Sequence, residues 1–98
     1  MEVEAVKVET FDSACNALAD IPADSANMKV RFEVLSVLEA RIRSWNMSQE
    51  AAAARLGITR PRLNDLLRGK VRKFSLDALI NIAPAAGFVV EIRIAEAA

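Results

Sequence analysis

The twenty residues 49–68, QEAAAARLGITRPRLNDLLR, constrain the fold more than any other part of the chain. Two short helices can cross at a steep angle only where a small residue lies at the contact and the connecting turn is unstrained. Ala53 is small enough for the contact, and Gly57 can adopt the positive φ that a tight turn after a helix needs. The turn and the second helix supply apolar residues for the buried side of the motif: Ile58, Leu63, Leu66 and Leu67. The segment therefore predicts a helix-turn-helix.

The second helix of this motif has recognisable start signals. Thr59 is the predicted N-cap, and Pro61 falls in the first turn, where a missing N–H costs nothing because it has no intrahelical partner. The outer face carries side chains that can hydrogen-bond base edges or phosphates: Arg60, Arg62, Asn64 and Asp65. The alternative interpretation is a helical hairpin that only packs into another all-α fold.

The charge of the chain is zero overall but unevenly distributed. Residues 41–73 contain nine basic residues against two acidic ones, Glu50 and Asp65, so this stretch carries +7 and the remainder −7. A basic stripe over a helix-turn-helix is typical of a DNA-binding module, and the acidic remainder indicates that another surface has a different task.

Composition argues against several other classes of protein. With 98 residues the chain is expected to form one domain, and no apolar run approaches the roughly 18 residues that span a bilayer, nor does the start resemble a secretory signal. We therefore expect a cytoplasmic protein. The chain has no histidine, which rules out the usual Cys/His metal sites and disfavours an enzyme, and we expect no cofactor. The single cysteine, Cys15, is expected to be a small buried hydrophobe on a short helix.

Apolar periodicity and caps delimit five expected helices, at residues 11–18, 24–45, 49–56, 59–68 and 75–86. Ser48 and Ser75 are the predicted caps of the third and fifth. Pro84 should kink the last helix or end it early, because proline removes a backbone hydrogen bond and crowds the preceding turn. The longest helix has an apolar stripe that we expect in the core: Met28, Phe32, Leu35, Leu38, Ile42 and Trp45.

Residues 88–94, FVVEIRI, alternate in the manner of a β-strand, which needs a partner. Either residues 3–9 provide it, or the same strand of a second chain pairs antiparallel about Ile92, which would set Glu91 opposite Arg93 of the other copy. A third interpretation is a hydrophobic tail that covers its own core. The predicted dimer interface consists of Phe88, Val89, Val90, Glu91, Ile92, Arg93 and Ile94.

The run SQEAAAARLGITRPRLNDLLRGKVRKFSLDALINIAPAAGFVVEIRI resembles the xenobiotic-response-element (XRE; Cro and phage-repressor) helix-turn-helix superfamily. More narrowly it is similar to HigA-type antitoxins, in which an "RGK…FSLDAL" segment and a short strand follow the motif; the likeness covers residues 24–94. The resemblance implies a mainly α, lambda-repressor-like fold of about five helices with a short C-terminal strand. It also implies a homodimer on a palindromic operator in double-stranded DNA, and often a RelE/HigB-like toxin whose ribonuclease activity the antitoxin blocks.

In that superfamily the second motif helix lies in the major groove with its N-terminal half against the bases. The positions matched to base edges are Arg60, Pro61, Arg62, Asn64 and Asp65. Either Arg60 or Arg62 is the expected guanine reader, and the alternative for each is a phosphate contact. The expected phosphate contacts are Gln49, Thr59, Arg68, Lys70, Arg72 and Lys73. Pro61 and Pro84 depart from much of the superfamily, which leaves the base contacts and the dimer geometry open.

The predicted organisation is an N-terminal segment, residues 1–23, with a strand, a short helix and an acidic toxin-docking surface, followed by a DNA-binding domain, residues 24–98, with its dimerisation strand at 88–94. The leading hypothesis is an antitoxin that represses its own operon. A stand-alone phage-type or XRE-family regulator without a toxin is the second. The third is a toxin-neutralising interaction module whose helix-turn-helix is mainly structural.

Overall fold

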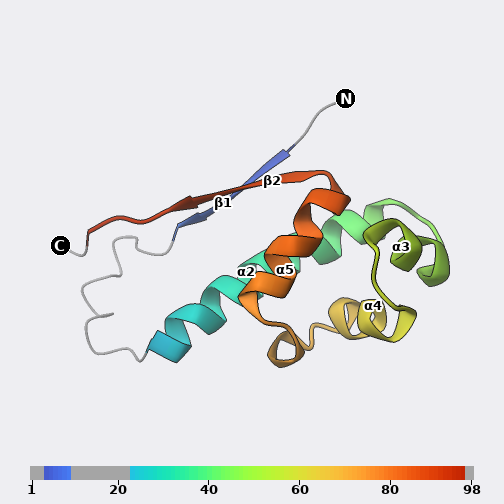
Figure 1. Ribbon diagram of the computed structural model, residues 1–98, viewed down its shortest axis with the longest axis horizontal. Coiled ribbons are helices and arrows are strands. Elements are labelled where there is room, and N and C mark those ends of the chain that lie inside the picture. Colours follow the sequence, from blue (N-terminus) through green and yellow to red (C-terminus); the bar gives the residue numbers. More distant parts are fainter. Residues whose placement is uncertain (1–3, 10–22, 97–98) are drawn as a thin grey trace.

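The computed structural model describes residues 4–9 and 23–96. The elements in chain order are β1 (Glu4–Glu9), α2 (Ala23–Ser44), α3 (Gln49–Leu56), α4 (Arg60–Leu67), the 3-10 turn η1 (Val71–Lys73), α5 (Leu76–Ile82), the 3-10 turn η2 (Ala83–Ala86) and β2 (Phe88–Arg93). In Figure 1, α3 and α4 lie at one end of the molecule, and a two-stranded ribbon runs along the side opposite α4. The predicted mainly α fold with a helix-turn-helix and a short C-terminal strand is confirmed. The predicted helix at 11–18, with Cys15, lies outside the described residues.

The helix-turn-helix forms through the expected local signals. The Ser48 hydroxyl accepts from the Ala51 N–H at 3.1 Å and begins α3, while the Thr59 hydroxyl accepts from the Arg62 N–H at 3.3 Å and begins α4. Gly57 lies between the two helices with φ of 73°, and its N–H donates to the Ala53 and Ala54 carbonyls. These bonds satisfy backbone groups that helix ends leave without partners.

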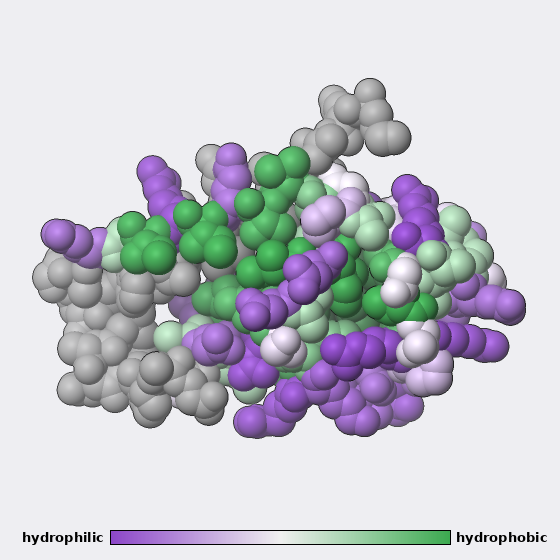
Figure 2. All heavy atoms as spheres, in the orientation of Figure 1, coloured by the Kyte–Doolittle hydropathy of each residue, from purple (hydrophilic) through white to green (hydrophobic). Residues whose placement is uncertain are grey.

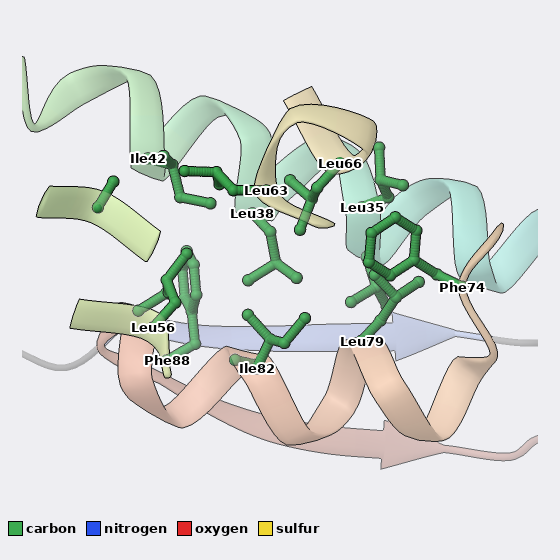
Figure 3. Packing of buried hydrophobic residues seen from close by; sticks show 14 of the residues in the cluster. Leu35, Leu38, Ile42, Leu56, Leu63, Leu66, Phe74, Leu79, Ile82 and Phe88 are labelled. Carbon is green, nitrogen blue, oxygen red and sulfur yellow. The ribbon is translucent and has the colours of Figure 1, made fainter. Parts of the chain in front are cut away.

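The core lies where α2, α4 and α5 meet. Figure 3 shows Leu38 of α2, Leu63 of α4 and Ile82 of α5 extending toward the same interior, and Phe74 closes one end of the cluster. The expectation that Phe32 belongs to this core is wrong, because its side chain is 57% exposed. Val34 is buried instead, and a residue two positions away lies roughly 200° around the helix. Among the described residues, no helix is both long and apolar enough to cross a membrane.

Pro84 ends the last helix as predicted. Helix α5 stops at Ile82, the chain continues as the short turn η2, and Gly87, with φ of 90°, directs it into β2. Arg41 of α2 stabilises this junction: its Nη1 donates to the Ala86 carbonyl at 2.9 Å and its guanidinium lies 4.2 Å from the centroid of the Phe88 ring. A Cβ at position 87 would approach that Nη1 to 3.0 Å, so glycine suits both the φ and the space.

Strand β2 pairs in parallel with β1, from Glu4 opposite Phe88 to Glu9 opposite Arg93. Of the partners considered for the C-terminal strand, the N-terminal segment is the one observed within the chain, so residues from both predicted domains share one sheet. Phe88 is 4% exposed and Val90 packs against the core, whereas Ile92 on the same face is 54% exposed. The apolar face of β2 therefore extends beyond the helices that could bury it.

Replacing Gly57 with alanine should lower the free energy of unfolding by about 1–2 kcal/mol, the usual cost of a left-handed conformation for a residue with a Cβ. Apart from residue 57 and its two chain neighbours, no atom lies within 4 Å of the added Cβ, so the loss would be conformational and not a clash with other parts of the protein. Urea unfolding of Gly57→Ala measures it. Gly57→Asn is the matched control and should lose less, because asparagine tolerates this region. Equal stability of Gly57→Ala and the wild type would contradict the explanation.

Candidate nucleic-acid interface

Helix α4 presents a polar face away from the core. Leu63 and Leu66 are fully buried, whereas Arg60, Pro61 and Arg68 are exposed. Because residues four apart lie on one side of a helix, Arg60, Asn64 and Arg68 form a single stripe. We call Arg60, Pro61, Asn64 and Arg68 the α4 outer face. Figure 2 shows hydrophilic atoms gathered along the lower right, where Figure 1 places α4.

Arg60 and Arg68 keep their guanidinium groups available on this face. Neither side chain has a hydrogen bond, an ion pair or a ring contact with the described part of the chain. Asn64 lies between them and is half-buried. A guanidinium and a carboxamide one turn apart on an exposed helix have the donors and acceptors that guanine and adenine edges present in the major groove.

Arg62 and Asp65, two of the five predicted base-edge residues, turn toward the segment that follows α4. Arg62 Nη1 donates to the Lys73 carbonyl at 3.1 Å, and its guanidinium lies 4.3 Å from the centroid of the Phe74 ring. The Asp65 carboxylate lies 3.5 Å from Lys70 Nζ and 3.8 Å from Lys73 Nζ. The structure therefore separates these two residues from the α4 outer face.

Residues 69–73, which we call the basic loop, form a compact turn beside α4. Gly69 has φ of 72°, the Lys70 N–H donates to the Asp65 carbonyl at 3.0 Å, and the Lys73 N–H donates to the Lys70 carbonyl at 3.0 Å. A shallow hollow of ≈ 400 Å³ lies over the five residues. Lys70, Arg72 and Lys73 are exposed, so three cations flank the helix that carries the predicted base readers.

Other arginines of the basic stretch have structural partners. Arg43 Nη2 donates to the Leu67 carbonyl at 2.9 Å and pairs with Glu39 at 3.0 Å, while Arg55 lies 4.0 Å over the Trp45 ring. Arg41, as described above, holds the start of β2. Arg41 and Arg43 thus each donate to a backbone carbonyl far along the chain, 45 and 24 residues away. These three arginines therefore contribute to the packing of the chain as well as to its positive charge.

Gln49 and Thr59, two of the predicted phosphate contacts, lie at the N-terminal ends of α3 and α4. Gln49 begins α3 and borders a shallow hollow of ≈ 370 Å³ shared with Asn46, Leu63 and Leu67. Thr59 uses its hydroxyl oxygen as the N-cap of α4. The described residues contain no group of three or more His, Cys, Asp or Glu side chains placed to hold a metal ion.

Sequence reasoning missed Arg31. Its Nη1 donates to the Phe74 carbonyl at 3.0 Å, across 43 residues of sequence. On the isolated helix Arg31 is one basic residue among several, and no local spacing signals a partner so far along the chain. Only the packing of α2 against the segment after the basic loop brings the two together.

Replacing Arg43 with methionine should lower the free energy of unfolding by about 0.5–1 kcal/mol, because a cation then no longer binds a last-turn carbonyl of α4. Thermal or urea unfolding measures the change. Glu39→Gln is the matched control, since it removes the ion pair and leaves the bond to Leu67 possible; its loss should stay within about 0.5 kcal/mol. Equal losses would assign the effect to the ion pair.

Comparison with known proteins agrees with this geometry. A family model described as a helix-turn-helix domain matches residues 17–95, which include α2 to β2. No match was found among the curated proteins or the solved structures. Since the model matches more than half of the sequence and the two crossing helices are present, the chain belongs to the family of helix-turn-helix domains.

Proposed function

We propose that this protein is a sequence-specific DNA-binding transcriptional repressor that inserts α4 into the major groove. The observation that carries the proposal is the polar stripe of exposed Arg60, half-buried Asn64 and exposed Arg68 on a helix whose opposite side is fully buried. Arg60 can donate two hydrogen bonds to guanine, and Asn64 can bind adenine in the same bidentate manner. Pro61 lies between them and can make apolar contact with a thymine methyl group.

Phosphate contacts would flank the base-reading stripe on both sides. Arg68 and the basic loop supply cations on one side, while Gln49 and Thr59, at the starts of α3 and α4, lie near the other. Such contacts fix the position of the helix on the duplex and carry no sequence information of their own. They also make the affinity depend on salt, because each neutralised phosphate releases counterions.

The role of Arg60 can be tested with a duplex selected by the wild-type protein from a random library. Arg60→Ala should reduce the preference for that duplex over random duplex by about 1–3 kcal/mol. Arg72→Ala, the matched control in the basic loop, should weaken binding to both duplexes equally and lower the salt slope by about one. Equal losses with Arg60→Ala would make Arg60 a phosphate contact, and failure to select any sequence would refute specific binding.

A homodimer through β2 is part of this proposal. Within the described residues β2 has one strand neighbour, β1, so its other edge has no strand partner. Val89, Ile92 and Ile94 are 51%, 54% and 75% exposed, and Figure 2 shows hydrophobic atoms along the course of the ribbon. Antiparallel pairing of two β2 edges about Ile92 would place these side chains beside those of the second copy and cover part of their apolar surface. The two α4 helices could then read a palindrome with half-sites about one DNA turn, ~34 Å, apart.

Ile92→Lys should therefore convert a dimer into a monomer in analytical ultracentrifugation and weaken binding to the selected duplex. The side chain is more than half exposed, so the fold should survive, as circular dichroism can verify. Val37→Lys on the exposed side of α2 is the control and should remain dimeric. A monomeric wild type, or a dimeric Ile92→Lys variant, would contradict the strand interface.

The resemblance to HigA-type antitoxins supports a finer role, in which the repressor also neutralises a RelE/HigB-like toxin. The acidic residues outside 41–73 would then attract a basic ribonuclease. A stand-alone regulator without a toxin is the alternative, and a neutralising module with a structural helix-turn-helix is a third possibility. A small basic toxin encoded beside this gene would favour the first and third over the second.

The acidic surface is better tested by substitution than by truncation, because removal of residues 1–23 would also remove β1, the partner of β2. Changing Glu2, Asp12 and Asp20 to their amides should weaken neutralisation of the adjacent toxin without loss of DNA binding. Arg60→Ala should weaken DNA binding and leave neutralisation of the toxin unchanged. Undiminished neutralisation by the triple amide variant would place toxin docking elsewhere on the protein.

A further inference from the structure

The contacts of Arg62 and Asp65 indicate that the polar residues of α4 have two different roles. We infer that Arg62, Asp65 and Arg31 are positioning residues, which hold the basic loop against α4 so that base-reading and phosphate-binding groups form one preassembled surface. The inference rests on the proposed DNA-binding function and deepens it. It takes Arg62 and Asp65 out of direct base recognition.

Arg62 is attached at two points, to the last residue of the basic loop and to the residue that follows it. Its Nη1 donates to the Lys73 carbonyl at 3.1 Å, and its Cζ lies over the Phe74 ring, 4.3 Å from the ring centroid. The ring is 1% exposed and belongs to the core, so it is a fixed support. A planar guanidinium can stack on an aromatic face while an N–H donates sideways, which a lysine ammonium cannot do.

A second arginine holds the neighbouring peptide from the other side. Arg31 of α2 donates through Nη1 to the Phe74 carbonyl at 3.0 Å. Two consecutive carbonyls, those of Lys73 and Phe74, are thus bound by guanidinium groups from two different helices. The end of the basic loop is fixed relative to α4 and to α2 at once.

Asp65 arranges the cations at the beginning and end of the loop. Its carboxylate lies 3.5 Å from Lys70 Nζ and 3.8 Å from Lys73 Nζ, and its carbonyl accepts from the Lys70 N–H at 3.0 Å. Partly exposed ion pairs add little stability, so their effect is on the placement of the lysines. A carboxylate facing the DNA backbone would repel phosphate, and this pairing neutralises it.

Preassembly has a direct consequence for binding. Ordering a flexible loop at an interface reduces affinity, whereas a loop that is already ordered avoids that cost. Because the loop backbone is tied to α4 itself, the residues that carry the three cations are held beside Arg60 and Asn64. The phosphate contacts of the ordered loop then add affinity for any duplex, whatever its sequence.

A double-mutant cycle separates positioning from base reading. Arg62→Ala is measured in the wild type and in a Lys70→Ala, Arg72→Ala, Lys73→Ala background, against the selected duplex and random duplex. If Arg62 is a positioning residue, Arg62→Ala in the wild type should weaken binding to both duplexes by a similar factor, about tenfold. In the loop-depleted background the same substitution should weaken binding by less than about twofold, because Arg62 acts through the loop. Arg60→Ala, the matched control, should cost the same factor in both backgrounds.

Arg62→Lys supplies a variant that keeps the charge. It should recover only part of the affinity, because the stack on Phe74 and the planar fork are lost. Full recovery would mean that the charge alone matters, and a fall in the preference for the selected duplex that persists in the loop-depleted background would make Arg62 a base reader. Either result would overturn the inference.

A measurement without DNA keeps this inference separate from the proposed function. The Phe74 N–H donates to the Val71 carbonyl at 3.2 Å, so its hydrogen exchange reports on the order of the loop. Arg62→Ala and Arg31→Met should each raise this exchange rate about tenfold relative to the Leu38 N–H in α2, whereas Arg60→Ala should leave it unchanged. Unchanged exchange in both variants would refute the positioning role even if DNA binding is established. Failure of the wild type to select any sequence would instead refute the proposed function.

Discussion

The burial of Leu63 and Leu66 of α4 against α2 is the contact on which the rest of the structure depends. Both leucines are fully buried, among Leu35, Leu38 and Ile42 of α2. Burial of one leucine side chain contributes about 1.5–3 kcal/mol. Because a helix has only one buried side here, this contact also determines which side chains of α4 face outward. The proposed base-reading stripe lies on the side of α4 that the core leaves exposed.

Four arginines bind backbone carbonyls at helix ends and turns of this small domain. Arg43 binds the end of α4 and Arg41 binds the end of η2. Arg62 binds the carbonyl of Lys73, the last residue of the basic loop, and Arg31 binds the carbonyl of Phe74, which follows it. Each of these acceptors lies outside regular helix or strand pairing, where a backbone carbonyl otherwise depends on water. Some of the cations counted in the basic stretch thus also stabilise the chain, and the proposed DNA-binding surface consists of the α4 outer face and the basic loop.

Several expectations succeeded because they depended on neighbours in sequence. Ser48, Thr59 and Ser75 cap their helices through hydrogen bonds to residues three positions away, and Gly57 and Pro84 act on the turns in which they lie. The expectation for Phe32 was wrong because an apolar stripe can be drawn on more than one side of a helix. Which side is buried depends on the position of α5 and α4, and no spacing within α2 encodes it.

The sequence by itself determined the helix-turn-helix, its caps, the interrupted last helix and the strand-forming character of the C-terminal segment, since all of these follow from short-range sterics and hydrogen bonding. Tertiary structure alone decided the partner of that strand, which is a parallel segment more than eighty residues away in sequence. It also decided that Arg60 faces outward while Arg62, two residues later, binds the Lys73 carbonyl. The physical reason is that both outcomes depend on which surfaces the core brings together, and contacts between distant residues leave no periodic signal in the chain.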